Sequence, residues 1–146
     1  MTTGTTLTIG EVGELTGLTT HTLRFYEQEG LFLAPVRRDS VGRRVFTEDE
    51  VEWLKVCTRL RSSGMPLEDI RRYARLVVAG PGTVSERFDI LRGHETRVQA
   101  QIAELQAALD VIRRKVAIYA DHLADGTADN LWRHGPQCAV DAVESR

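Results

Sequence analysis

A long apolar stripe in the second half of the chain limits its fold more than any other feature. From residue 84 to 124, large apolar residues recur alternately three and four positions apart, the heptad spacing that places them along one side of a helix. Glu95 is the single break in a stripe made of Phe88, Leu91, Val98, Ile102, Leu105, Leu109, Ile112, Val116, Tyr119 and Leu123. The pattern predicts one helix over 84–124, about 60 Å long at a rise of ~1.5 Å per residue.

This helix is too long to bury its stripe against a small domain made from the preceding residues. A monomeric bundle would need other long helices, which the sequence does not predict. A second copy of the same helix is the simplest partner, so we expect a homodimer. The residues expected at its contact are Val98, Ile102, Leu105, Leu109, Ile112, Val116 and Tyr119.

The first 79 residues predict shorter helices with clear start and stop signals. Three Thr-x-x-Glu capping boxes can each satisfy free N–H groups at the start of a helix: Thr8–Glu11, Thr47–Glu50 and Thr83–Glu86. Thr19 is a fourth start, and glycines suited to helix ends stand at Gly17, Gly30, Gly64, Gly80 and Gly126. These signals predict helices over 9–16, 20–29, 48–62, 67–79 and 84–124.

The segment 33–46 predicts a short hairpin, because a turn sequence at 39–42 has β-branched residues on either side. The expected fold class is therefore mainly α, with an N-terminal winged helix-turn-helix followed by a long dimerisation helix. We expect three regions: the winged helix-turn-helix over 7–79, the coiled-coil helix over 84–124, and a tail over 127–146 as a possible effector region.

Two short helices joined at Gly17 and Leu18 are typical of the helix-turn-helix, whose second helix enters the major groove of DNA. Its first residues then face base edges, and here they are Thr19, Thr20, His21, Thr22 and Arg24. Threonine and arginine suit phosphate and base contacts. Taken alone, these residues fit an ordinary capped helix with a solvated polar face equally well.

The predicted hairpin favours the DNA interpretation over a loose basic loop. It carries four arginines against the single acid Asp39: Arg37, Arg38, Arg43 and Arg44. Pairing of the two strands would bring four guanidinium groups together, and their repulsion is unfavourable without an anion. A phosphate backbone supplies one, and arginine binds phosphate in a bidentate manner.

Overall composition gives no independent support for nucleic-acid binding, since 19 basic and 21 acidic residues leave a net charge of −2. Any DNA-binding charge must be a local patch. We expect a soluble cytoplasmic protein, because the sequence shows neither a signal peptide nor a membrane-spanning stretch. No phosphate loop, metal cluster or nucleophile–His–acid trio stands out, so we expect neither an enzyme nor a cofactor. A coiled-coil adaptor without DNA binding is the alternative, but it explains only residues 84–124.

Five segments, in order between residues 7 and about 75, resemble the successive signatures of the MerR family. They are Thr8-Ile9-Gly10-Glu11-Val12, Thr22-Leu23-Arg24-Phe25-Tyr26-Glu27, Gly30-Leu31, Gly42-Arg43-Arg44-Val45-Phe46 and Ser63-Gly64-Met65-Pro66-Leu67-Glu68-Asp69-Ile70. The resemblance implies a regulator, dimeric through an antiparallel coiled coil, that binds promoters with overly long spacers between the −35 and −10 elements. It would bend and untwist the spacer on activation and so realign both elements for RNA polymerase.

The resemblance also implies roles for particular residues. Arg24 and Tyr26 match recognition-helix residues that touch DNA, and Arg44 matches the wing arginine. Arg43 and Phe46 depart from the family, which usually has tyrosine at the first position and often at the second. Arginines in 48–79 either contact flanking phosphate or are simply solvated; they are Arg59, Arg61, Arg71, Arg72 and Arg75.

For an effector, the resemblance points to the short members that answer thiol-reactive signals or small molecules and lack the metal sensors' cysteine pair. The candidate sensors are Cys57 and Cys138. Cys57 is either a buried core residue or a reactive thiolate, the latter if nearby Lys55, Arg59 and Arg61 lower its pKa.

Two further effector classes stay open. His134 and Cys138 are four positions apart, but two ligands are too few for a closed metal site, so we assign no metal. A small organic ligand is the other alternative, in a pocket lined by Trp53, Tyr119, His122 and Trp132.

Overall fold

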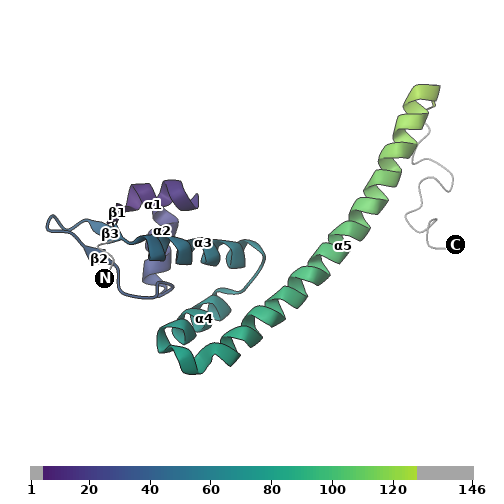
Figure 1. The fold of residues 1–146 in the computed structure, drawn as a ribbon. Coiled ribbons are helices and arrows are strands. Elements are labelled where there is room, and N and C mark those ends of the chain that lie inside the picture. Colours follow the sequence, from purple (N-terminus) through teal and green to yellow (C-terminus); the bar gives the residue numbers. More distant parts are fainter. Residues whose placement is uncertain (1–4, 128–146) are drawn as a thin grey trace. The chain divides into compact units, whose positions relative to one another are not determined.

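The computed structural model describes residues 5–127, and this part of the chain is mainly helical (Figure 1). Its helices begin and end within one residue of the predicted ranges: α1 (Ile9–Thr16), α2 (Thr20–Gln28), α3 (Glu48–Ser62), α4 (Leu67–Ala79) and α5 (Val84–Asp125). A short 3-10 helix, η1, lies between α4 and α5 (Pro81–Thr83), and the strands are β1 (Leu7–Thr8), β2 (Arg37–Arg38) and β3 (Arg44–Phe46). The prediction of a helix-turn-helix followed by a long helix is confirmed.

Two of the three predicted capping boxes begin helices as expected. Thr8 with Glu11 caps α1, and Thr47 with Glu50 caps α3, each through the reciprocal pair of hydrogen bonds. The third prediction is wrong, because the Thr83 hydroxyl donates backward to the carbonyl oxygens of Leu76 and Gly80, at 2.6 and 2.8 Å. The turn of η1 therefore leads into α5 without that box.

The predicted hairpin is present as β2 and β3, which pair antiparallel with Arg38 opposite Arg44. A further strand, β1, pairs with the other side of β3 and gives the sheet order β1-β3-β2. β1 is only two residues long, which is too short for a period-2 pattern to reveal it. Because β1 ends at Thr8, the N-cap of α1, the sheet ties the start of α1 to the hairpin.

An apolar core joins the four short helices to the sheet. Its largest fully buried side chains are Phe46, Leu23, Leu31, Leu54, Met65, Ile70, Val12 and Cys57. Trp53 also belongs to it, since its ring stacks on Tyr73 with centroids 5.6 Å apart and its indole N–H donates to the Leu31 carbonyl at 2.7 Å. Trp53 is therefore a core residue and does not line an open ligand pocket, which corrects that part of the sequence interpretation.

The chain divides into two compact units, one ending at Val98 and one beginning at Gln99, and each is described by itself. The division falls inside α5 because the first turns of this helix pack on the N-terminal unit. Ile90 lies against the core, and the nearly buried His94 bonds through Nε2 to the Ser63 hydroxyl oxygen at 2.7 Å.

From Gln99 onward, the described part of α5 exposes its apolar stripe. Ile102 and Leu105 are 60% and 70% exposed, and the structure shows no buried residue between 99 and 127. The stripe is thus uncovered within residues 5–127 of a single chain. None of the helices in this range is long and apolar enough to cross a membrane.

Candidate nucleic-acid interface

The helix-turn-helix is formed by α1 and α2 with a close turn between them. Gly17 ends α1 with φ 74°, the left-handed region that favours glycine. Within α1, a Cβ on Gly13 would lie 2.9 Å from the Leu18 carbonyl oxygen, so only glycine fits where the turn folds back. Leu23 is buried, as expected for the side of α2 that faces the core. Sequence reasoning assigned no role to Gly13.

The first turn of α2 is largely exposed, and it is capped by Thr19, one of the predicted DNA-contacting residues. The Thr19 hydroxyl oxygen accepts from the Thr22 N–H at 3.1 Å, and the two hydroxyl oxygens lie 2.9 Å apart. Thr20, His21 and Arg24 are exposed, and their side chains make no polar contact within residues 5–127. Thr19 and Thr22 thus stabilise the start of α2, while the side chains of Thr20, His21 and Arg24 stay available for a ligand.

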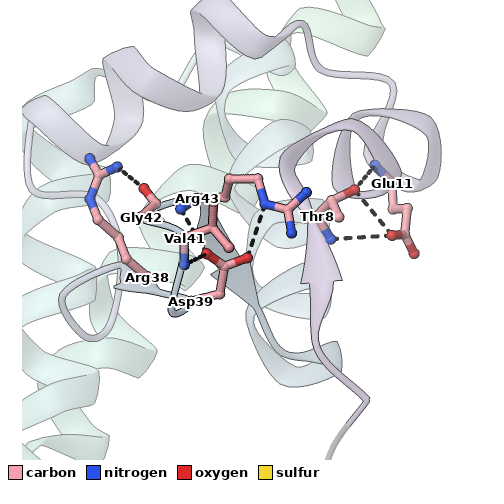
Figure 2. Close-up of polar contacts among 7 residues, drawn as sticks. All are labelled: Thr8, Glu11, Arg38, Asp39, Val41, Gly42 and Arg43. Atoms are coloured by element: carbon pink, nitrogen blue, oxygen red, sulfur yellow. Dashed lines mark hydrogen bonds and ion pairs between the residues drawn. The ribbon is translucent and has the colours of Figure 1, made fainter.

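Asp39 organises the turn of the hairpin, which we call the wing (residues 37–46), as Figure 2 shows. Its Oδ1 accepts from the backbone N–H groups of Arg43 and Val41, at 2.9 and 3.0 Å, and its Oδ2 accepts from Arg43 Nε at 3.1 Å. Bonding by the Arg43 and then the Val41 backbone N–H holds the pKa of Asp39 below its ordinary value. Arg38 donates to the Gly42 carbonyl at 2.8 Å, within the same turn.

Two of the four wing arginines have carboxylate partners, so the predicted mutual repulsion is largely offset inside the protein. Arg43 pairs with Asp39, and Arg44 Nε pairs with Glu27 Oε2 of α2 at 2.6 Å. Within residues 5–127, the charges of Arg37 and Arg38 have no such partner. The expectation that Asp39 is the single acid facing these four arginines is therefore wrong, because Glu27 of α2 supplies a second carboxylate.

The wing, α1 and α2 nevertheless meet around a pocket of about 280 Å³ that gathers arginines. It is lined by the N-cap Thr8, Ile9 at the first turn of α1, Asp39 and Gly42 of the turn, and by Arg24, Arg38, Arg43 and Arg44. Free N–H groups at a helix start and guanidinium groups both attract anions. We call this site the arginine pocket; Arg37 lies outside its lining.

Tyr26 is placed differently from the expectation that it touches DNA. Its side chain is 5% exposed, it belongs to the core, and its ring centroid lies 6.3 Å from that of Phe25. Burial, and next the nearby Cys57, raise the pKa of Tyr26 against an opposing effect of Arg61. Its ring thus helps to hold α2 on the core.

Among the arginines of α3 and α4, Arg71 is committed to internal contacts. Its Nε donates to the Glu29 carbonyl at 2.9 Å, one terminal nitrogen binds the Glu29 carboxylate at 2.6 Å, and the other binds Glu68. Arg72 lies 3.8 Å from Glu86, and Arg61 donates to the Met65 carbonyl at 3.3 Å. Arg71 therefore braces α4 against the end of α2, which excludes it as a free phosphate ligand.

Cys57 is a buried core residue, which confirms one of the two sequence interpretations. Burial raises the pKa of its thiol from the ordinary 9.0 to about 12, with a backbone hydrogen bond opposing. The expectation that Lys55, Arg59 and Arg61 would lower this pKa is wrong, because desolvation dominates. Residues 5–127 contain no group of three potential metal ligands, and Cys138, His134 and Trp132 lie outside them.

Comparison with known proteins matches both parts of this architecture. Residues 7–76 match the MerR HTH family of regulatory proteins, and residues 51–115 match the MerR DNA-binding family. An uncharacterized HTH-type transcriptional regulator of Haemophilus influenzae is 38% identical over 122 residues, which cover 84% of this chain and 90% of that protein.

Solved structures agree. The crystal structure of HiNmlR, described as a MerR family regulator lacking the sensor domain and bound to promoter DNA, has a TM-score of 0.80 and 35% identity over 89% of this chain and 98% of that one. A putative MerR family regulator of Listeria monocytogenes has a TM-score of 0.75 and 28% identity, over 84% and 92% of the two chains. The matches extend from the helix-turn-helix into the long helix. This chain therefore belongs to the MerR family of DNA-binding transcriptional regulators.

Proposed function

We propose that the protein is a homodimeric regulator that binds the spacer of a promoter and bends and untwists it for RNA polymerase. The arginine pocket is the observation that carries this proposal. It joins the start of α1, the exposed side of α2 and the wing, and its charge and helix N–H groups suit a phosphate of the DNA backbone. HiNmlR, a relative of similar fold, is described as bound to promoter DNA.

In this arrangement the first turn of α2 would enter the major groove, and the wing would contact the adjacent backbone. The exposed side chains of Thr20, His21 and Arg24 are the candidates for base contacts. Arg37, Arg38, Arg43 and Arg44 are the candidates for phosphate contacts. Thr19 contributes by capping α2, Thr22 by bonding to that cap, and Tyr26 from the core.

The homodimer would form through the exposed stripe of α5, which we propose pairs antiparallel with a second copy. Two DNA-binding units held at a fixed separation could then bind two half-sites and deform the spacer between them, at a cost of several kcal/mol. An effector would act by favouring one arrangement of the two units. With Cys57 buried, Cys138 is the thiol to test first, and a small organic ligand is the second class.

The test measures binding of duplex DNA by the variants Arg24→Ala and Arg44→Ala. Both should weaken binding strongly while the proteins remain dimeric, because each removes a guanidinium group that lines the arginine pocket. Arg113→Ala, which removes the same charge from an exposed position on α5, is the matched control and should bind like the unmodified protein. Full binding by both pocket variants would contradict the proposed interface.

Salt dependence separates this function from that of a coiled-coil adaptor. Each phosphate neutralised should add about −0.9 to the slope of log affinity against log salt concentration. The unmodified protein should therefore show a steep slope, and Arg44→Ala a shallower one. An adaptor without DNA binding would give no measurable slope. It would also leave the DNA unbent, so its addition would not change the energy transfer between dyes at the two ends of the duplex.

A further inference from the structure

We propose that Glu27 is a positioning residue for DNA binding, whose carboxylate orients the guanidinium of Arg44 and thereby fixes the wing to α2. This inference rests on the DNA-binding function proposed above. Glu27 lies in the last turn of α2 and Arg44 begins β3, so the contact joins two elements through residues 17 positions apart.

The contact is suited to orient a side chain. Arg44 Nε donates to Glu27 Oε2 at 2.6 Å, and the two side chains are only 23% and 31% exposed. A short charge-assisted hydrogen bond that is partly shielded from water restrains a guanidinium group better than an exposed surface pair does. Arginine has further N–H donors on its two terminal nitrogens, and within residues 5–127 those of Arg44 have no partner. Arg44 is thus held at Nε while its terminal donors remain free beside the arginine pocket that it lines.

The other wing arginines are held only by the wing itself. Arg43 pairs with Asp39 four positions away, and its side chain is 72% exposed. Arg38 donates to the Gly42 carbonyl in the same turn. Across residues 5–127, the Glu27–Arg44 pair is the one hydrogen bond or ion pair between side chains of the wing and of α2. It is therefore the polar side-chain link that adds to the packing of Phe46 in the shared core and holds the wing against α2.

The effect of Glu27→Gln on DNA affinity distinguishes a positioning role from simple repulsion, because the two predict changes in opposite directions. A carboxylate near a polyanion is repelled by it, so the charge of Glu27 taken by itself weakens DNA binding. Replacement of Glu27 by neutral glutamine would then strengthen binding if Glu27 did nothing else. A positioning role predicts the opposite, because the amide oxygen of glutamine offers Arg44 only a weaker, neutral hydrogen bond in place of the charge-assisted one.

The experiment uses the full-length protein and a duplex that the unmodified protein selects from a randomised pool. We expect Glu27→Gln to raise the dissociation constant by up to about tenfold, because a charge-assisted hydrogen bond is replaced by a neutral one. The salt slope should become shallower by about 0.9, as for the loss of one phosphate contact. Glu52→Gln removes an exposed carboxylate that pairs locally with Lys55 on α3, and this control should change affinity by less than about twofold.

A double-mutant cycle shows whether Glu27 acts through Arg44. In the Arg44→Ala background, Glu27→Gln should no longer weaken binding, because no guanidinium remains to be oriented, and the loss of a repelled carboxylate should slightly strengthen it. The inference is overturned if Glu27→Gln binds as tightly as the unmodified protein or tighter, or if it weakens binding just as much in the Arg44→Ala background.

Arg44→Lys keeps the proposal testable if Glu27→Gln does not fold. Lysine retains the charge but cannot bond a carboxylate and a phosphate through two edges of one rigid group, so affinity should again fall about tenfold. Unchanged affinity for Arg44→Lys would overturn the inference. If the unmodified protein selects no duplex, the proposed DNA binding itself fails, whereas a selected duplex bound equally well by Glu27→Gln refutes only the role of Glu27.

Discussion

Similar apolar residues are buried in one unit of this chain and exposed in the other. In the N-terminal unit, Leu54 is 1% exposed within a core built from four short helices and a sheet. On α5 beyond Gln99, Leu105 is 70% exposed, although it belongs to a regular heptad stripe. The difference shows that burial here follows the availability of a second surface and not the apolar content of a segment.

Short connections explain why the first unit supplies its own surfaces. The chain reverses at Gly17 and again before Met65, so that α1, α2, α3 and α4 face one another at close range. α5 extends over 42 residues as one helix, and only its first turns belong to the N-terminal unit. The first unit is therefore expected to bury its apolar residues by folding on itself. The stripe is expected to be buried only by contact with another molecule.

Leu105→Glu should have the strongest consequence, and it should disrupt only the contact made by the exposed stripe of α5. It places a carboxylate in the proposed dimer contact of each chain, and removing each from water costs several kcal/mol. Light scattering should give the mass of one chain, DNA affinity should fall, and core amides of α3 should keep their protection from hydrogen exchange. Gln101→Glu adds the same charge at an exposed position off the stripe and should stay dimeric. A dimeric Leu105→Glu would contradict the stripe as the contact.

Phe46→Ala should instead destabilise the core of the N-terminal unit. Phe46 is 1% exposed, and its ring centroid lies 5.8 Å from that of Phe32, so its truncation should lower the free energy of unfolding by about 3–5 kcal/mol. Urea unfolding followed by circular dichroism measures this loss, and light scattering without urea should still show a dimer. Phe25→Ala, at a partly exposed ring on α2, should cost much less. Equal losses for the two variants would argue against a closed core around Phe46.

Counted per pH unit, the weakest consequence is the one expected at Cys57, where it tests how closed the core is. Burial raises the pKa of this thiol to about 12, so the folded protein holds the proton more tightly than the unfolded chain, with its ordinary 9.0. The resulting stability is constant below pH 9 and is lost as pH rises from 9 toward 12, by up to about 1.4 kcal/mol per pH unit. Urea midpoints of the unmodified protein should fall faster over this interval than those of Cys57→Ala. Parallel curves would show that the thiol is not shielded.

Most of the fold could be predicted because its signals are local. The capping box at Thr8 and the heptads of α5 each occupy a few neighbouring positions, and the structure places these helices within a residue of expectation. β1 could not be predicted, since two residues carry no readable pattern and the strand exists only through its pairing with β3. The capping box predicted at Thr83 is wrong for a related reason, because its hydroxyl bonds backward to the carbonyl of Leu76, a contact outside the box.

The candidate site was predictable as a group of residue types but not as a set of free and occupied ones. The sequence identifies the wing arginines, yet the acid that holds Arg44 is Glu27, on another element. Arg71 is separated from its partner Glu29 by 42 positions, so its commitment could not be inferred from spacing. The burial of Tyr26 likewise depends on tertiary packing, which no local pattern records.

The bonds of Asp39 have a consequence for recognition by the wing. Side-chain bonding to the N–H two residues ahead locks the loop into a single turn while the protein is still free. A flexible loop would lose conformational entropy on docking, at roughly 1–2 kcal/mol per residue for the backbone. A macromolecule that contacts this hairpin meets a surface whose ordering was completed during folding, so little of the association free energy is spent on loop immobilisation.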